Sequence, residues 1–118
     1  MFDQPALEIE QFEEMHELLG DDFAAMLLPF FEDSADRLKL AKSQLLSKNS
    51  ADQTLALDHL HTLKGASLSI GAARLSAICR HMEQLIRARV PAEAIGFIET
   101  AEGALKEFEH QAKQTLSL

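Results

Sequence analysis

The sequence predicts an all-α protein, an antiparallel four-helix bundle with a short additional helix at the N-terminus. Trp and Tyr are absent, only three prolines occur among 118 residues, and Leu, Ala and Glu, which favour helix over sheet, are abundant. Apolar residues recur at helical spacing, and no run of β-branched residues alternates as a strand would. At 47% apolar composition one compact core suffices, so we expect residues 1–118 to form a single domain.

The first two helices follow from their apolar stripes and end signals. A short, acidic helix over residues 7–19 ends at Gly20, a plausible stop. Its stripe consists of Ile9, Phe12, Met15 and Leu19. A long helix spans most of residues 22–48, with Asp21 or Asp22 as its cap and lysines late, as the helix dipole favours. Its stripe consists of Phe23, Met26, Leu27, Phe30, Ser34, Leu38, Ala41 and Leu45.

Three more helices complete the prediction. Ser50 caps a third that reaches about Ile70, and Gly71 permits a sharp connection into a fourth. Pro91 suits the first turn of a fifth, which we expect to run unbroken to about Leu116. We expect the third helix to bury Leu55, Ala56, Leu63, Ala66 and Ile70. The stripe of the fourth is Leu75, Ile78, Cys79, Met82, Leu85 and Ile86, and that of the fifth is Ile95, Ile98, Ala101, Leu105, Phe108, Ala112 and Leu116.

Composition narrows the classes of function. The net charge of −8 argues against nonspecific nucleic-acid binding, although residues 37–89 are locally basic. No apolar run is long enough to span a membrane and no basic leader precedes one, so we expect a cytoplasmic protein without membrane attachment. Cys79 is the single cysteine, which excludes an internal disulfide and a multi-thiolate metal site. We expect it to be a small buried side chain.

His61 stands out on the third helix, because a helical wheel places it opposite the apolar side. Its outer face combines an imidazole with a cation, a glycine and two leucines, which is unusual for a merely solvated surface. A glycine inside a helix costs about 1 kcal/mol relative to alanine, so Gly65 suggests that another surface approaches the backbone there. The other residues within about 60° of His61 are Thr54, Leu57, Asp58, Lys64 and Leu68.

A phosphoryl carrier would use each of these features. The imidazole is a nucleophile that is mostly neutral near pH 7, and Lys64 would balance part of the nearly two negative charges that the phosphoryl group adds. Gly65 would give the partner access, while Leu57 and Leu68 would provide apolar docking area. Asp58 would join these two leucines in the docking surface. Asp58, one turn earlier, would either hold the ring by a hydrogen bond or favour its protonated form; the sequence leaves both open.

The residues after His61 fit a known signature: Lys64-Gly65, then Gly71 at the tenth position, then Leu75, Cys79 and Glu83. This pattern, with an acidic opening that ends in Leu-Gly-Asp-Asp-Phe, resembles histidine-containing phosphotransfer (HPt) domains. The resemblance implies a four-helix bundle and a phosphoryl group carried on His61.

The resemblance also implies the partners of a bacterial phosphorelay. The receiver aspartate of a hybrid sensor kinase would donate the phosphoryl group, and the receiver of a response regulator would accept it. Mg²⁺ would be bound by the receiver, so we expect the carrier to have no cofactor of its own. We also expect no kinase activity and a monomeric protein. Leu60 and Leu68 depart from the pattern, since family members usually carry small residues there. We expect Leu68 to narrow the choice of receivers without blocking transfer.

Two other functions compete with the carrier. One is a scaffold that binds a receiver without accepting phosphate. The other is a metal- or haem-binding bundle, although the inward Glu-x-x-His spacing of such sites is absent. Its candidate ligands would be His16, His59, His61, His81 and His110. We expect His59 instead to lie on the buried side of its helix, as a packed or internally hydrogen-bonded histidine. Arg74 and Arg80 would form either a docking rim or a solvated face.

Overall fold

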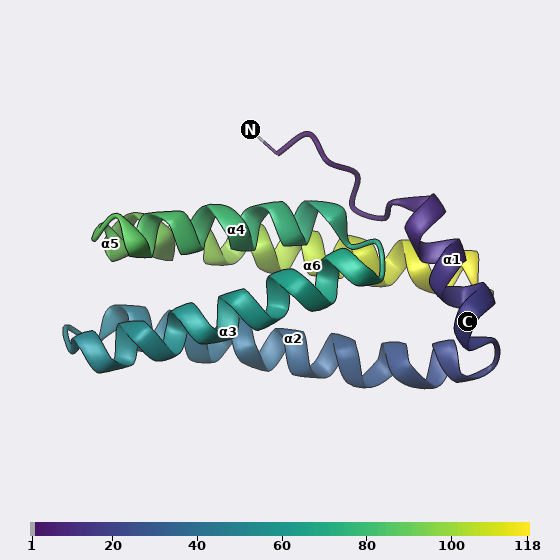
Figure 1. The fold of residues 1–118 in the computed structure, drawn as a ribbon, viewed down its shortest axis with the longest axis horizontal. Helices are drawn as coiled ribbons and strands as arrows, with labels where there is room; N and C mark the ends of the chain where they lie inside the picture. The colour runs from purple at the N-terminus through teal and green to yellow at the C-terminus, as the bar shows by residue number, and fades with distance from the viewer. Residues whose placement is uncertain (1) are drawn as a thin grey trace.

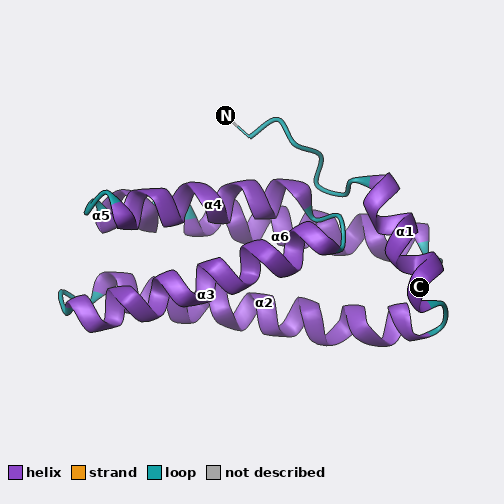
Figure 2. Ribbon diagram, viewed as in Figure 1, coloured by secondary structure: helices purple, strands orange, loops and turns teal. Residues whose placement is uncertain are grey.

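The computed structural model describes residues 2–118, and all regular structure in that range is helical (Figure 2). This confirms the predicted all-α class. Within these residues six helices follow one another with short connections: α1 (Ile9–Leu19), α2 (Asp22–Leu46), α3 (Ser50–Ser69), α4 (Ala73–Arg87), α5 (Pro91–Ile95) and α6 (Ile98–Thr115).

Four of these helices form the predicted antiparallel bundle. Helix α3 packs against α2 and α4, and α6 packs against the same two helices, so α3 and α6 occupy opposite corners (Figure 1). Successive long helices run in opposite directions, as their short connections require. Helix α1 lies across one end of the bundle, and α5 forms part of the turn at the other end.

The core is apolar and closes at the α1 end with aromatic rings. Phe12 of α1 is fully buried, with its ring centroid 4.9 Å from that of Phe23 in α2 and 6.0 Å from that of Phe108 in α6. Both pairs are edge-to-face, a favoured geometry for aromatic rings. This cluster fixes the short first helix on the bundle through Phe12. Ile9, which the predicted stripe also included, is exposed because it lies in the first turn of α1 at the edge of the bundle.

The buried stripe of α3 differs from the predicted one in two positions. Leu55 and Ala66 are exposed, whereas Leu60 and Ser67 are buried. The helix packs on both α2 and α4, and the arc between these neighbours advances in steps of three and four residues. Its members are Ala56, Leu60, Leu63, Ser67 and Ile70. The helical wheel centred the buried side directly opposite His61. In the packed bundle the buried side is rotated about the helix axis, so that Leu60 and Ser67 are buried in place of Leu55 and Ala66.

The predicted fifth helix is divided into α5 and α6. The chain turns at Gly96 and Phe97, whose N–H groups donate to the carbonyls three residues earlier instead of four. Phe97 then packs edge-to-face against the rings of Phe2 and His81. The prediction of one unbroken helix was therefore wrong. Gly96 weakens the helix at the point where the side chain of Phe97 makes tertiary contacts.

Gly71 joins the α3–α4 connection to the start of α1. Its φ of +88° lies in the left-handed region, and its carbonyl accepts a hydrogen bond of 2.7 Å from the N–H of Glu8. A Cβ at this position would lie 2.7 Å from the carbonyl oxygen of Glu8 and 3.1 Å from the backbone N of Phe12. Only glycine satisfies both the conformation and this close approach.

Gly71→Ala is expected to lower the free energy of unfolding by about 2 to 4 kcal/mol, because strain at positive φ adds to a backbone clash. For a domain of this size the thermal midpoint should fall by roughly 10 °C, which calorimetry measures. Gly103→Ala is the matched control. Its Cβ would meet nothing within 4 Å and its φ is ordinary, so the midpoint should hold or rise. Equal thermal midpoints for Gly71→Ala and wild type would contradict the requirement for glycine at position 71.

Candidate functional site

His61 lies in the middle of α3 with its side chain in solvent. The side chain is 65% exposed, which confirms the predicted outward orientation. Its ring faces the neighbouring helix α4, where one carboxylate lies within hydrogen-bonding distance. The exposed imidazole is therefore held in place by a second helix.

Glu83 of α4 connects the two polar side chains of this face. Its Oε1 lies 2.9 Å from Nδ1 of His61, and its Oε2 lies 2.8 Å from Nζ of Lys64. The carboxylate is only 6% exposed, so both bonds are made at the edge of the core, where water competes weakly. Each oxygen of Glu83 thus has its own partner.

This geometry determines which ring nitrogen of His61 can react. A carboxylate only accepts hydrogen bonds, so Nδ1 carries a proton and donates it to Glu83. In a neutral imidazole Nε2 is then unprotonated, and its lone pair is available on the exposed side of the ring. The bundle presents an oriented nitrogen nucleophile to an incoming partner.

The interaction with Glu83 was not predicted, although a signal was present. Glu83 is one residue after Met82 and four after Cys79, so it falls on the apolar stripe of α4. A carboxylate on a buried stripe requires a partner. What the sequence could not supply was the register of α3 against α4, which brings position 83 level with position 61.

Asp58 and His59 precede His61 on α3, but neither is bonded to Glu83 as His61 is. Asp58 is exposed, and the ring nitrogen that it was a candidate to hold is bonded to Glu83 instead. His59 is half-buried with Nδ1 3.1 Å from Nη1 of Arg37, whose Nε donates to Asp33 over 2.8 Å. His59 is therefore a half-buried histidine that is bonded within the chain.

The remaining predicted residues form the surface around the ring. A Cβ added to Gly65 would meet nothing within 4 Å, so its missing side chain leaves open space on the outside of α3. Leu68 is 62% exposed and Leu57 is half-buried, which is compatible with the predicted docking area. Leu60, by contrast, is fully buried between helices and presents no surface to a partner.

Cys79 packs in the core directly below this face. Burial, and secondarily the negative charge of Glu83, raise the pKa of its thiol to about 12, while Lys64 opposes the shift. Cys79 therefore stays protonated at neutral pH and is not a second nucleophile.

The described residues form neither a metal-binding cluster nor a membrane-spanning helix. Among residues 2–118, no three His, Cys, Asp or Glu side chains are grouped closely enough to hold a metal ion. In the same range no helix has the length and apolar character needed to span a membrane.

Comparisons of the sequence with known proteins show which family the chain belongs to. The family model of the Hpt domain matches residues 25–115. The chain is also 32% identical over 116 residues to histidine-containing phosphotransfer protein 4 of Arabidopsis thaliana, in an alignment that covers 92% of this chain and 80% of that protein. No solved structure gives a significant match. With most of its length in the match, the chain belongs to the Hpt domain family, and its function is phosphotransfer in two-component signalling.

Proposed function

We propose that His61 accepts a phosphoryl group from the receiver aspartate of a hybrid sensor kinase and passes it to the receiver aspartate of a response regulator. The observation that carries this proposal is the exposed His61 ring with Nδ1 bonded to a nearly buried Glu83. The chain would act as a cytoplasmic carrier, charged by another protein rather than by ATP. Family membership supports the class of reaction, and the geometry supports this residue.

In the transfer step the lone pair of Nε2 attacks phosphorus as the bond to the aspartate oxygen breaks. The aspartate leaves as a carboxylate, and the proton on Nδ1 remains there. The phosphorylated ring then carries a positive charge, which the carboxylate of Glu83 stabilises across the 2.9 Å bond. Transfer to the second receiver is the reverse of this step, so no proton has to leave the site.

Lys64 provides a positive charge that is held close to His61 before transfer. Its Nζ is 2.8 Å from Glu83 before transfer, and its side chain is 30% exposed. As an i+3 neighbour of His61 it can turn toward a phosphoryl group that arrives with nearly two negative charges. The receiver is expected to supply Mg²⁺ and most of the transition-state stabilisation, so the carrier needs no cofactor of its own.

The proposal is tested by incubating the purified protein with a panel of receiver domains that carry radiolabelled aspartyl phosphate. We expect the protein to gain label that is labile in acid and stable in alkali, as phosphohistidine is, and peptide mapping to place it at His61. A protein that binds receivers but gains no label would be the competing scaffold. Label at another residue would refute the role of His61.

Gly65→Ala separates stability from transfer. Because the added Cβ meets nothing within the chain, the variant should be more stable by up to about 1 kcal/mol. The same methyl group stands where the receiver must approach, and we expect transfer to slow by about tenfold, equivalent to roughly 1.4 kcal/mol of lost docking energy.

Gly103→Ala in α6 is again the matched control, because its Cβ also meets open space but lies on the helix at the opposite corner. It should gain similar stability without any change in transfer. Denaturant titration measures stability, and single-turnover transfer at subsaturating receiver measures the loss of docking. An unchanged transfer rate in Gly65→Ala would show that the missing side chain of Gly65 is not needed for the receiver to approach.

A further inference from the structure

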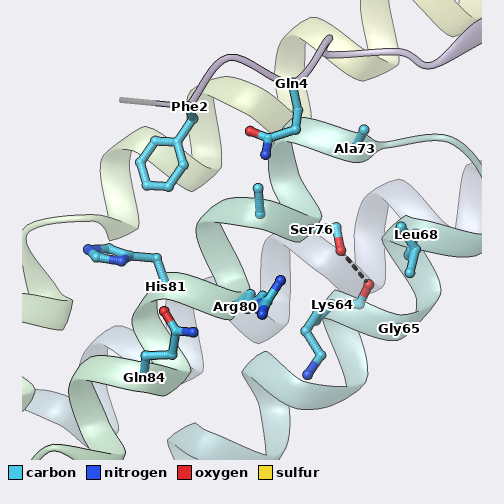
Figure 3. Close-up of a pocket in the computed structure, with 11 residues that line it drawn as sticks. Phe2, Gln4, Lys64, Gly65, Leu68, Ala73, Ser76, Arg80, His81 and Gln84 are labelled. Carbon is cyan, nitrogen blue, oxygen red and sulfur yellow. Dashed lines mark hydrogen bonds between the residues drawn. The ribbon is translucent and has the colours of Figure 1, made fainter.

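A groove runs beside the His61 face, between α3, α4 and the N-terminal segment. Figure 3 shows the residues that line it. Its volume is about 710 Å³. Lys64, Gly65 and Leu68 line it from α3, while Phe2 and Gln4 close it from the N-terminal side. Because Lys64 and Gly65 belong to both, the groove is continuous with the surface that surrounds His61.

The N-terminal wall of the groove is fixed by contacts to the bundle. The guanidinium of Arg74 donates to the carbonyl of Gln4 over 2.9 Å, and its backbone N–H donates to the carbonyl of Pro5 over 3.0 Å. The ring of Phe2 packs edge-to-face against His81 of α4, with centroids 5.7 Å apart. The groove is therefore a feature of the folded chain with a defined third wall.

Arg80 differs from the other cations on this side of the molecule. Lys64 is paired with Glu83, and Arg74 with Glu107 at 2.9 Å. Arg80 is exposed and lines the groove, yet within residues 2–118 no carboxylate oxygen lies within 4.0 Å of its guanidinium. Arg80 thus presents a positive charge that no carboxylate of the described residues pairs.

We propose that this groove binds an acidic, partly apolar segment of the receiver next to its reacting aspartate, with Arg80 as the residue that recognises the negative charge. The inference rests on the proposed function, since it assumes that a receiver docks at His61.

Two observations favour this occupant. A receiver that places its aspartate over Nε2 of His61 must also cover the adjoining surface at Gly65 and Leu68, which is the edge of the groove. The groove then offers apolar contact from Leu68 and Phe2 and one unpaired cation from Arg80, which suit an acidic segment with apolar residues. A docking residue of this kind affects binding and its salt dependence more than the chemical step.

The test is the transfer of phosphoryl groups to Arg80→Glu, measured across receiver concentrations and ionic strengths. We expect the KM for the phosphorylated receiver to rise by about tenfold and its salt dependence to weaken, while kcat stays within about twofold. Ala77→Phe should raise KM as well, because it fills the groove without a change of charge. Circular dichroism and thermal midpoints must show that both variants are folded.

Lys106→Glu is the matched control, because it makes the same charge change on an exposed position of α6, at the corner opposite α3. Its KM should equal that of wild type. A fall in kcat at unchanged KM in Arg80→Glu would overturn the proposal, since Arg80 would then act on the phosphoryl group itself. An unchanged KM in either groove variant would also overturn it.

The failure of this inference is distinguishable from the failure of the proposed function. If wild type gains no label from any receiver, the carrier assignment fails. If wild type gains label at His61 and the groove variants behave like wild type, only the docking groove fails. Sedimentation of wild type tests a further occupant, because a dimer that Ala77→Phe disrupts would assign the groove to a second copy of this chain.

Discussion

His61→Gln will abolish the acid-labile label that wild type gains from a phosphorylated receiver, because the amide of Gln has no nucleophilic nitrogen lone pair. The fold should be unaffected, since the side chain is 65% exposed and makes one side-chain hydrogen bond at 2.9 Å. Gln keeps a donor that can reach Glu83, so the carboxylate does not lose its partner. Autoradiography measures the label, and circular dichroism and the thermal midpoint measure the fold.

The control for this variant is His110→Gln. His110 is exposed on α6, at the opposite corner of the bundle from α3, and its replacement should leave labelling intact. Residual label in His61→Gln above the level of a buffer blank would mean that another side chain accepts the phosphoryl group. Loss of label in both variants would point to a general effect on binding instead.

Glu83→Leu is expected to slow transfer at saturating receiver by about 10- to 100-fold, the range typical when the hydrogen-bonding partner that orients a metal-ligating histidine is removed. This corresponds to roughly 1.4 to 2.7 kcal/mol of activation free energy. Without the bond to Oε1, the ring of His61 loses its orientation and its preference for a proton on Nδ1. The measurement is single-turnover transfer, which reports the chemical step.

The conservative variant Glu83→Gln separates orientation from charge. Its amide oxygen can still accept from Nδ1, so it should recover most of the rate that Glu83→Leu loses. Lys64 would no longer have its carboxylate partner at 2.8 Å, and a phosphorylated His61 would lack the charge that offsets its own. Glu109→Leu on α6 provides the control. Wild-type rates in Glu83→Leu would show that the hydrogen bond has no kinetic role.

The fold was largely predictable because helical periodicity is a local property. The stripes of α2 and α4 indicated which faces are buried, and Gly20 ended the first helix as expected. One error is local: Asn49, not the predicted Ser50, caps α3, because its side-chain oxygen accepts from the N–H of Ala51. The other errors lie where a tertiary contact competes with local preference. Leu55 is exposed because α3 packs toward one flank, and the helix predicted from Pro91 breaks at Gly96, beside the aromatic contacts of Phe97.

For the functional site, the sequence by itself determined that His61 faces outward with Lys64 and Gly65 beside it. These residues belong to one helix, and the angle between side chains on a helix follows from their spacing alone. Only the tertiary structure decided that Glu83 orients the ring, and that Arg80 lies in a groove closed by Phe2 with no carboxylate of residues 2–118 paired to it. These pairings depend on the register between helices, which the packing of the whole core sets and no local pattern encodes.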